Sequence, residues 1–203
     1  MTKMSMVHMN SNIMCAIDIS TNHPDPLIGE IFQISIVPLD AVLIPQGIPF
    51  DTLIRTDTEF FDSKDNKRMF EHSKKTGLPQ ESVWELFDSW FNQLGLRENK
   101  NIIPLCWDWA FVKPHLMKFF GEYNFDTFFN KQVRDVLPLV HFNNDRADFH
   151  ALDIPYPKYE ALTNLAQRCT IYIDGEPRDP LYRCKVLGQV YHELCMDRSV
   201  TIL

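Results

Sequence analysis

The sequence predicts an α/β fold in which helices flank a mixed sheet of five strands. Three observations predict it. Short apolar runs typical of buried strands open the chain, segments with a helical period of apolar residues follow, and the composition of 45% hydrophobic and 23% charged residues is that of a chain that buries a core. At 203 residues the chain has the length of one domain. We expect residues 1–11 to form a flexible tail and residues 12–203 to form this single domain.

The first 55 residues predict an antiparallel meander. Residues 13–19 are a nearly continuous apolar run typical of a buried central strand, and residues 20–29 are rich in turn-forming Pro, Asn, Asp and Gly. Residues 30–39 and 50–55 predict the second and third strands. Short turns between such strands favour antiparallel pairing.

The middle of the chain alternates helices with strands. Residues 79–94 carry apolar side chains at helical spacing and are followed by Gly95, a residue typical of helix ends. Residues 101–106 predict a fourth strand, followed by a helix that ends at Gly121. A fifth strand is expected at 132–137.

The last third of the chain predicts a loop and two helices. Residues 142–157 show no period and are expected to form a loop, in which Phe142 and Phe149 either tuck under the loop or present a docking surface. The helices are expected at about 157–168 and 180–196. This order places later strands parallel to the first one, so the sheet is mixed.

Composition excludes several classes of protein. Lys and Arg total 20 against 27 Asp and Glu, and a net charge of -7 weighs against a protein that mainly grips phosphates. No run of 18 apolar residues is present, so we expect no membrane insertion, and the opening residues do not resemble a secretory signal. Five cysteines without metal-ligand spacing indicate reduced thiols in a cytoplasmic compartment. Basic residues are concentrated in one segment, where acidic residues are interleaved with them, and this pattern predicts a solvated helix face. The basic residues are Lys64, Lys67, Arg68, Lys74 and Lys75.

Four local strings carry a resemblance to a known family. They are residues 16–21 (AIDIST), 106–116 (CWDWAFVKPHL), 133–136 (VRDV) and 182–188 (YRCKVLG). Together with the element order over about residues 12–196, they resemble the DEDD-type 3′–5′ exonucleases of the RNase T and phage exonuclease A kind, in a degenerate form. The resemblance implies an RNase H-like fold.

The resemblance also implies what the active site needs. The family hydrolyses phosphodiesters with two Mg²⁺ ions held by carboxylates, and a His or Tyr orients the attacking water. Matched position by position, Asp18 is retained, while Ser20 replaces a Glu. Val112 and Val186 replace two Asp residues, and Tyr182 replaces the His. Because valine cannot coordinate a cation, we expect no catalysis of the family type, no cofactor and no metal, with Asp18 as a weak candidate ligand.

Several residues keep alternatives open. Asp108 and Asp179 are expected to be helix N-caps, but with Asp18 they could form a rearranged Mg²⁺ site. Trp107 and Trp109 could stack on bases, although packing against the sheet is the simpler interpretation.

These observations lead to one functional hypothesis and two alternatives. The hypothesis is an inactive exonuclease-fold protein that binds a protein partner or acts as an adaptor, encoded by a phage and working in the host cytoplasm. The first alternative is a module that binds single-stranded nucleic acid without hydrolysing it. The second, less favoured, is an active metal-dependent exonuclease with a rearranged site.

Overall fold

The sheet has five strands in the predicted mixed arrangement. A computed structural model describes residues 12–59, 64–96, 100–151 and 161–196. The strand order is β3-β2-β1-β4-β5, with antiparallel pairing among the first three and parallel pairing of β4 with β1 and of β5 with β4. The strand bounds are β1 Ile13–Thr21, β2 Ile31–Pro38, β3 Phe50–Leu53, β4 Ile102–Cys106 and β5 Arg134–Asp135. The predicted fold class and the antiparallel meander are confirmed.

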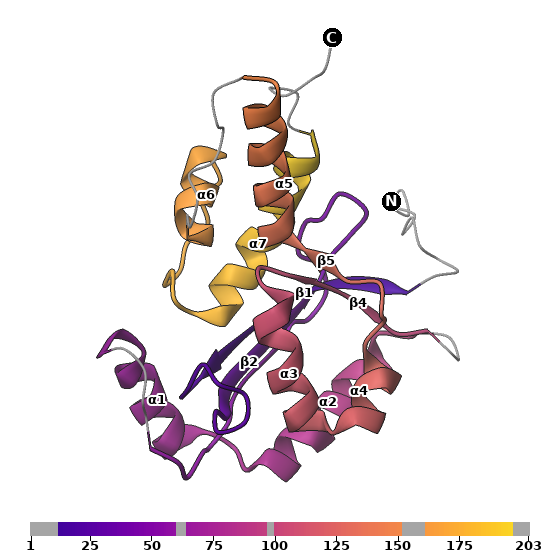
Figure 1. The fold of residues 1–203 in the computed structure, drawn as a ribbon. Coiled ribbons are helices and arrows are strands. Elements are labelled where there is room, and N and C mark those ends of the chain that lie inside the picture. Colours follow the sequence, from indigo (N-terminus) through magenta and orange to yellow (C-terminus); the bar gives the residue numbers. More distant parts are fainter. Residues whose placement is uncertain (1–11, 60–63, 97–99, 152–160, 197–203) are drawn as a thin grey trace.

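Helices cover both faces of this sheet (Figure 1). Figure 1 shows α2, α3 and α4 grouped on one side, and α5, α6 and α7 on the other. The helix bounds are α1 Lys64–Thr76, α2 Gln80–Gln93, α3 Trp109–Phe120, α4 Glu122–Phe128, α5 Val136–Phe149, α6 Leu162–Arg168 and α7 Pro180–Met196. In the part of the chain that the structure describes, no helix is long and apolar enough to cross a membrane.

The side chains of β1 point alternately to the two faces of the sheet, and each face has its own hydrophobic core. Ile17 and Ile19 belong to the cluster that includes residues of α2, α3 and α4. Ala16 belongs to the second cluster, which is built with residues of α5, α6 and α7. Because successive side chains of a strand point to opposite faces, Asp18 lies on the same face as Ala16, toward α7.

The prediction of a loop at 142–157 is wrong as far as residue 149. This stretch continues α5, whose buried face consists of Val136, Val140, Asn143, Asn144 and Ala147. The two asparagines stand at helical spacing where apolar residues are usual, so a search for apolar periodicity misses the helix. Phe142 and Phe149 are exposed on it. The remainder of the predicted loop, 152–157, and the predicted tail at 1–11 lie outside the described residues.

The other differences are a shifted boundary and an additional helix. The fifth strand is shorter than the predicted 132–137, because Val136 already begins α5. The helix α4, directly after Gly121, was not predicted.

Candidate functional site

The retained carboxylate, Asp18, lies within β1 rather than at its end. Its side chain is 16% exposed and forms an ion pair with the Nε–H of Arg183, which α7 contributes. The same guanidinium donates through Nη2 to the Ile19 carbonyl oxygen at 3.3 Å. The guanidinium of Arg183 therefore neutralises Asp18, the one carboxylate that the resemblance retains.

Burial raises the pKa of Asp18, and the charge of Arg183 opposes that rise. The nearby Asp179 carboxylate adds to the rise by repulsion. A buried carboxylate in this setting depends on its guanidinium partner to stay ionised. Arg183 is thus the electrostatic counterpart of Asp18.

A polar network beside this pair fixes the start of α7 to the sheet. Gln33 Nε2 donates to the Asp179 carboxylate at 2.9 Å and to the Asp51 carboxylate at 3.2 Å. Ser35 Oγ also donates to Asp51. Asp51 and Asp179 therefore each receive hydrogen bonds from within the chain, as Asp18 does.

Asp18 and Arg183 line a cavity of about 400 Å³, which we call the Asp18 cleft. It is lined by Asp18, Trp107, Ala161, Leu162, Thr163, Pro177, Arg178, Arg183 and Leu187. Position-by-position matching missed Arg183 and Leu187, although both lie within the matched string 182–188. Their spacing of four residues, one turn of a helix, is the signal that could have placed both on one face.

The other matched residues do not meet in this cleft. Val112 is buried in the core with α2, α3 and α4, whereas Val186 is fully buried in the core on the opposite face. Ser20 is buried within the sheet, where it pairs with Gln33 in register. Tyr182 is half-buried, and its ring approaches Gly175 closely enough that a Cβ there would meet it at 2.8 Å.

Two expected helix caps are present. Asp108 Oδ1 accepts a hydrogen bond from the Phe111 N–H at 3.2 Å and precedes α3. Asp179 Oδ1 accepts from the Leu181 N–H at 3.0 Å, directly before Pro180 begins α7. Both carboxylates of the alternative site therefore have capping roles.

The two tryptophans flanking Asp108 have different surroundings. Trp109 packs into the core with α4, where its ring lies 6.1 Å from that of Phe125. Trp107 packs against the core on the α7 side and lines the Asp18 cleft. Of the two tryptophans, only Trp107 borders the Asp18 cleft, where a ligand could stack on its ring.

The fold is shared with solved nucleases. The nuclease domain of 3′hExo, a DEDDh family member bound to rAMP, aligns with a TM-score of 0.62 and 13% identity over 93% of this chain and 94% of its own. The fold is that of the DEDD exonucleases. Cell-death related nuclease 4 aligns with a TM-score of 0.62 and 16% identity over 92% of this chain and 64% of its own.

Exonuclease I shares the fold as part of a longer chain. The E. coli enzyme in complex with a 5cy-dT13 oligonucleotide aligns with a TM-score of 0.65 and 10% identity, over 94% of this chain and 42% of its own. No protein-family model matches the sequence, and a search of curated proteins also gives no match. The comparisons therefore establish the exonuclease fold.

The residues present do not fit the two ions that an exonuclease site of this type uses. Asp18 is ion-paired to Arg183, and the residues that the resemblance matches to the family's other carboxylates are Ser20, Val112 and Val186. Among the residues that the structure describes, no three His, Cys, Asp or Glu side chains are grouped so that they could hold a metal ion. The donor set of the exonuclease fold is not assembled around Asp18.

Proposed function

We propose that this chain is a catalytically inactive protein with the exonuclease fold, and that it acts by binding a protein partner. The observation that carries the loss of activity is the ion pair between Asp18 and Arg183. The DEDDh neighbour places the fold among nucleases, but the cleft of this chain pairs its carboxylate internally.

Charge and dehydration both oppose the binding of divalent ions at Asp18. A divalent ion at Asp18 must compete with a guanidinium that the chain holds in contact with the carboxylate, and Mg²⁺ gives up its water reluctantly. Oxygen ligands from several carboxylates normally offset that dehydration, but the matched positions offer hydrocarbon side chains at Val112 and Val186. Asp18 alone is a poor site for two cations.

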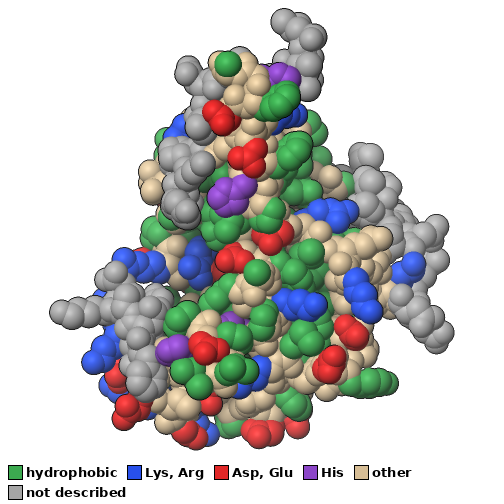
Figure 2. Space-filling model, viewed as in Figure 1, with side chains coloured by type: hydrophobic (Ala, Val, Ile, Leu, Met, Phe, Trp, Pro, Cys, Tyr) green, Lys and Arg blue, Asp and Glu red, His purple; other side chains and the backbone are tan. Residues whose placement is uncertain are grey.

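Surface character supports a protein partner. The net charge is -7, and on the face in Figure 2 the Lys and Arg side chains of the described residues are scattered among acidic and hydrophobic ones. Large apolar side chains are exposed at several places; they include Leu27, Ile48, Phe142 and Phe149. Five free cysteines fit a reducing compartment, which supports the further proposal of a phage-encoded factor in a bacterial cytoplasm.

The loss of activity is tested with 3′-labelled single-stranded DNA and RNA in Mg²⁺ or Mn²⁺. We expect no shortening by the wild-type chain. Metal-dependent degradation that disappears in Asp18→Ala, but persists in the exposed-site control Asp126→Ala, supports instead an active, rearranged site.

The partner is tested by affinity purification from the native host. A protein identified in this way should bind the purified chain directly. Failure of every recovered protein to bind in a reconstituted mixture contradicts the adaptor role.

One observation favours a second function, the binding of single-stranded nucleic acid without hydrolysis. Arg178 lines both the Asp18 cleft and a neighbouring hollow of about 590 Å³, whose other lining residues are Arg68, Met69, His72 and Glu176. Together with Trp107 and Arg183, this provides cations and an aromatic ring along connected hollows. Retention of an oligonucleotide that falls steeply with salt and weakens in Arg68→Ala supports this function, and absence of binding at low salt removes it.

A further inference from the structure

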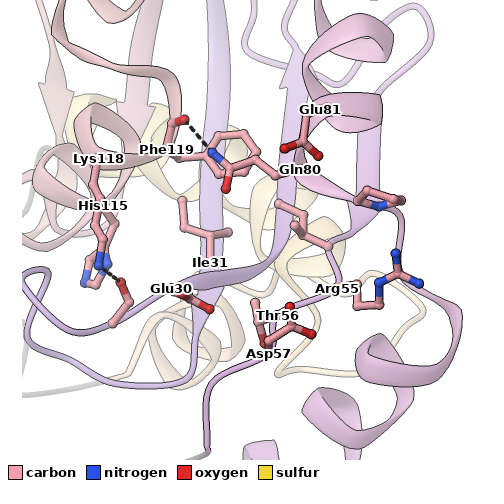
Figure 3. Close-up of a pocket in the computed structure, with 13 residues that line it drawn as sticks. Glu30, Ile31, Arg55, Thr56, Asp57, Gln80, Glu81, His115, Lys118 and Phe119 are labelled. Carbon is pink, nitrogen blue, oxygen red and sulfur yellow. Dashed lines mark hydrogen bonds between the residues drawn. The ribbon is translucent and has the colours of Figure 1, made fainter.

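A second cavity, of about 420 Å³, is shown in Figure 3. Its apolar lining residues belong to the core opposite the one beside the Asp18 cleft, and the two cavities share no lining residue. We call it the α3-side cavity. Four segments build it: the β1–β2 connection, the chain after β3, the start of α2, and α3. It is lined by Gly29, Glu30, Ile31, Ile54, Arg55, Thr56, Asp57, Pro79, Gln80, Glu81, His115, Lys118 and Phe119.

His115 lines this cavity and carries a buried nitrogen acceptor without a partner. The residue is only 1% exposed, and its Nε2 lies 3.3 Å from the Pro24 carbonyl oxygen. A carbonyl oxygen can only accept, so Nε2 carries the proton of this hydrogen bond. Burial lowers the pKa of His115, which keeps the ring neutral and leaves Nδ1 as a bare acceptor; Nδ1 is buried without a hydrogen-bond partner.

Thr56 supplies a second unpartnered polar atom. The residue is 5% exposed, and its Oγ1 is buried without a hydrogen-bond partner. Buried polar atoms almost always have partners, because leaving one unpaired costs about 1–3 kcal/mol. Two such atoms, on residues that line one cavity, indicate a ligand that donates hydrogen bonds.

The charges around the cavity favour the same kind of ligand. Glu30, Asp57 and Glu81 contribute carboxylates to its lining. The ammonium of Lys118 already donates to the carbonyl oxygens of Leu27 at 3.1 Å and Gly29 at 2.9 Å.

The three carboxylates differ in their partners. Glu30 Oε2 accepts a hydrogen bond from Thr58 Oγ1 at 2.8 Å, whereas Asp57 and Glu81 accept no side-chain hydrogen bond from the other described residues that line the cavity. Figure 3 shows the Arg55 guanidinium on the side of the cavity away from His115. Gln80 donates to the Phe119 carbonyl oxygen at 3.2 Å. Ile31, Ile54 and Phe119 provide apolar surface among these acceptors.

We propose that the α3-side cavity binds a primary ammonium or guanidinium group on an aliphatic stem, supplied by a Lys or Arg side chain of the protein partner. The acidic side chains attract the charge, Thr56 and His115 accept its N–H groups, and the apolar surface contacts the methylenes. Leu27 and Ile28 are 85% and 57% exposed in the segment that walls the cavity, and they extend the contact to apolar residues of the partner. This inference rests on the proposed protein-binding function and specifies its chemistry.

The inference is tested by NMR titration of the full chain with Nα-acetyl-lysine methylamide. Nα-acetyl-norleucine methylamide is the matched control ligand, since it keeps the stem and lacks the ammonium. We expect resonances of α3 and of residues 54–57 to shift with the lysine compound, and the norleucine compound to bind at least about tenfold more weakly. Equal binding of both compounds, or no shift up to about 10 mM of the lysine compound, overturns the inference.

Variants locate the binding within the cavity. Asp57→Asn combined with Glu81→Gln should weaken binding about tenfold or more, since two attracting charges are removed. Thr56→Val should weaken it while leaving the fold intact, because its hydroxyl has no partner to lose. Glu85→Gln is the matched control, an exposed acid on α2 outside the lining. Unchanged binding in both cavity variants contradicts the site.

The source of the cation is decided by a second ligand pair. A blocked peptide that places Lys beside apolar residues should bind at least about tenfold more tightly than free 1,4-diaminobutane. Tighter binding of the diamine overturns the assignment to a partner side chain and assigns the cavity to a free polyamine. The nuclease assay above measures a different property, so failure of this titration leaves the proposed loss of activity intact.

Discussion

The two cavities differ in how their polar groups are satisfied. At the Asp18 cleft and in the polar network beside it, the carboxylates of Asp18, Asp51 and Asp179 all receive hydrogen bonds from this chain. In the α3-side cavity, the buried acceptors of Thr56 and His115 receive none. The carboxylates at and beside the Asp18 cleft have internal partners, although Gln33 Oε1 in the same network is buried without one. The α3-side cavity differs in that two residues of its own lining, Thr56 and His115, carry buried acceptors without a partner.

The largest expected effect comes from removing the internal partner in the cleft. Arg183→Met should lower the free energy of unfolding by about 1–3 kcal/mol near neutral pH, because Asp18 is left buried without its counter-charge. The folded-state pKa of Asp18 is raised by burial and rises further without the guanidinium. Ionisation of Asp18 therefore destabilises this variant, so the deficit is greatest at high pH and shrinks as the pH falls through the folded pKa.

Urea denaturation at several pH values measures this effect. The double variant Asp18→Asn with Arg183→Met is the control, and it should recover most of the stability because the stranded charge is gone. A deficit in Arg183→Met that does not change with pH contradicts the pairing.

An effect of similar size is expected where the chain walls the α3-side cavity. In Gly29→Ala the new Cβ meets the His23 carbonyl oxygen, with the Asp25 carbonyl oxygen at 2.8 Å and His115 Cε1 at 2.9 Å. We expect a loss of about 1–3 kcal/mol in thermal or urea unfolding. Gly95→Ala is the comparison, since that site has open space and only a positive φ of 64°, and it should lose about 1 kcal/mol. Equal losses of stability in the two variants contradict the explanation that neighbouring backbone oxygens crowd a Cβ at Gly29.

A smaller effect separates an unpartnered hydroxyl from a satisfied one. Thr56→Val should not lower the free energy of unfolding, because no hydrogen bond within the chain is lost and the cost of a buried hydroxyl without a partner is removed. Ser73 is also buried, but its Oγ donates to the Phe70 carbonyl oxygen at 2.7 Å. Ser73→Ala should therefore cost about 1 kcal/mol in the same denaturation series. A large loss in Thr56→Val indicates an internal partner for Thr56 and weakens the case for a ligand.

Thiol labelling sharpens the comparison without changing stability. Cys184 lies on α7 next to Arg183 and is fully buried, and burial raises its pKa well above the ordinary value. Cys195 is exposed near the other end of the same helix. A neutral alkylating reagent should label Cys195 readily and Cys184 only when the protein unfolds. Rapid labelling of Cys184 in the native protein shows that the Asp18 cleft opens.

Most of the fold could be predicted from sequence because most of its elements follow a simple apolar period. Helix α2 illustrates this, since its buried residues are Val83, Phe87 and Trp90. Helix α5 could not be found in the same way, because Asn143 and Asn144 occupy its buried face. A period defined by burial is visible in sequence only when the buried residues are apolar.

The candidate site was predictable in part. Asp18 and the two capping carboxylates, Asp108 and Asp179, were singled out on local grounds, and the structure places both caps as expected. The partnership of Asp18 with Arg183 spans 165 positions, so no local pattern reveals it. The α3-side cavity was missed for the same reason, since its four segments are distant in sequence and its decisive feature is an absent hydrogen bond.

The most direct test of the central claim is a crystal structure of the chain soaked in Mn²⁺. The account predicts that Arg183 stays in contact with Asp18 and that no pair of ions appears between them. Two bound ions bridged by the Asp18 carboxylate, with the guanidinium displaced, contradict it.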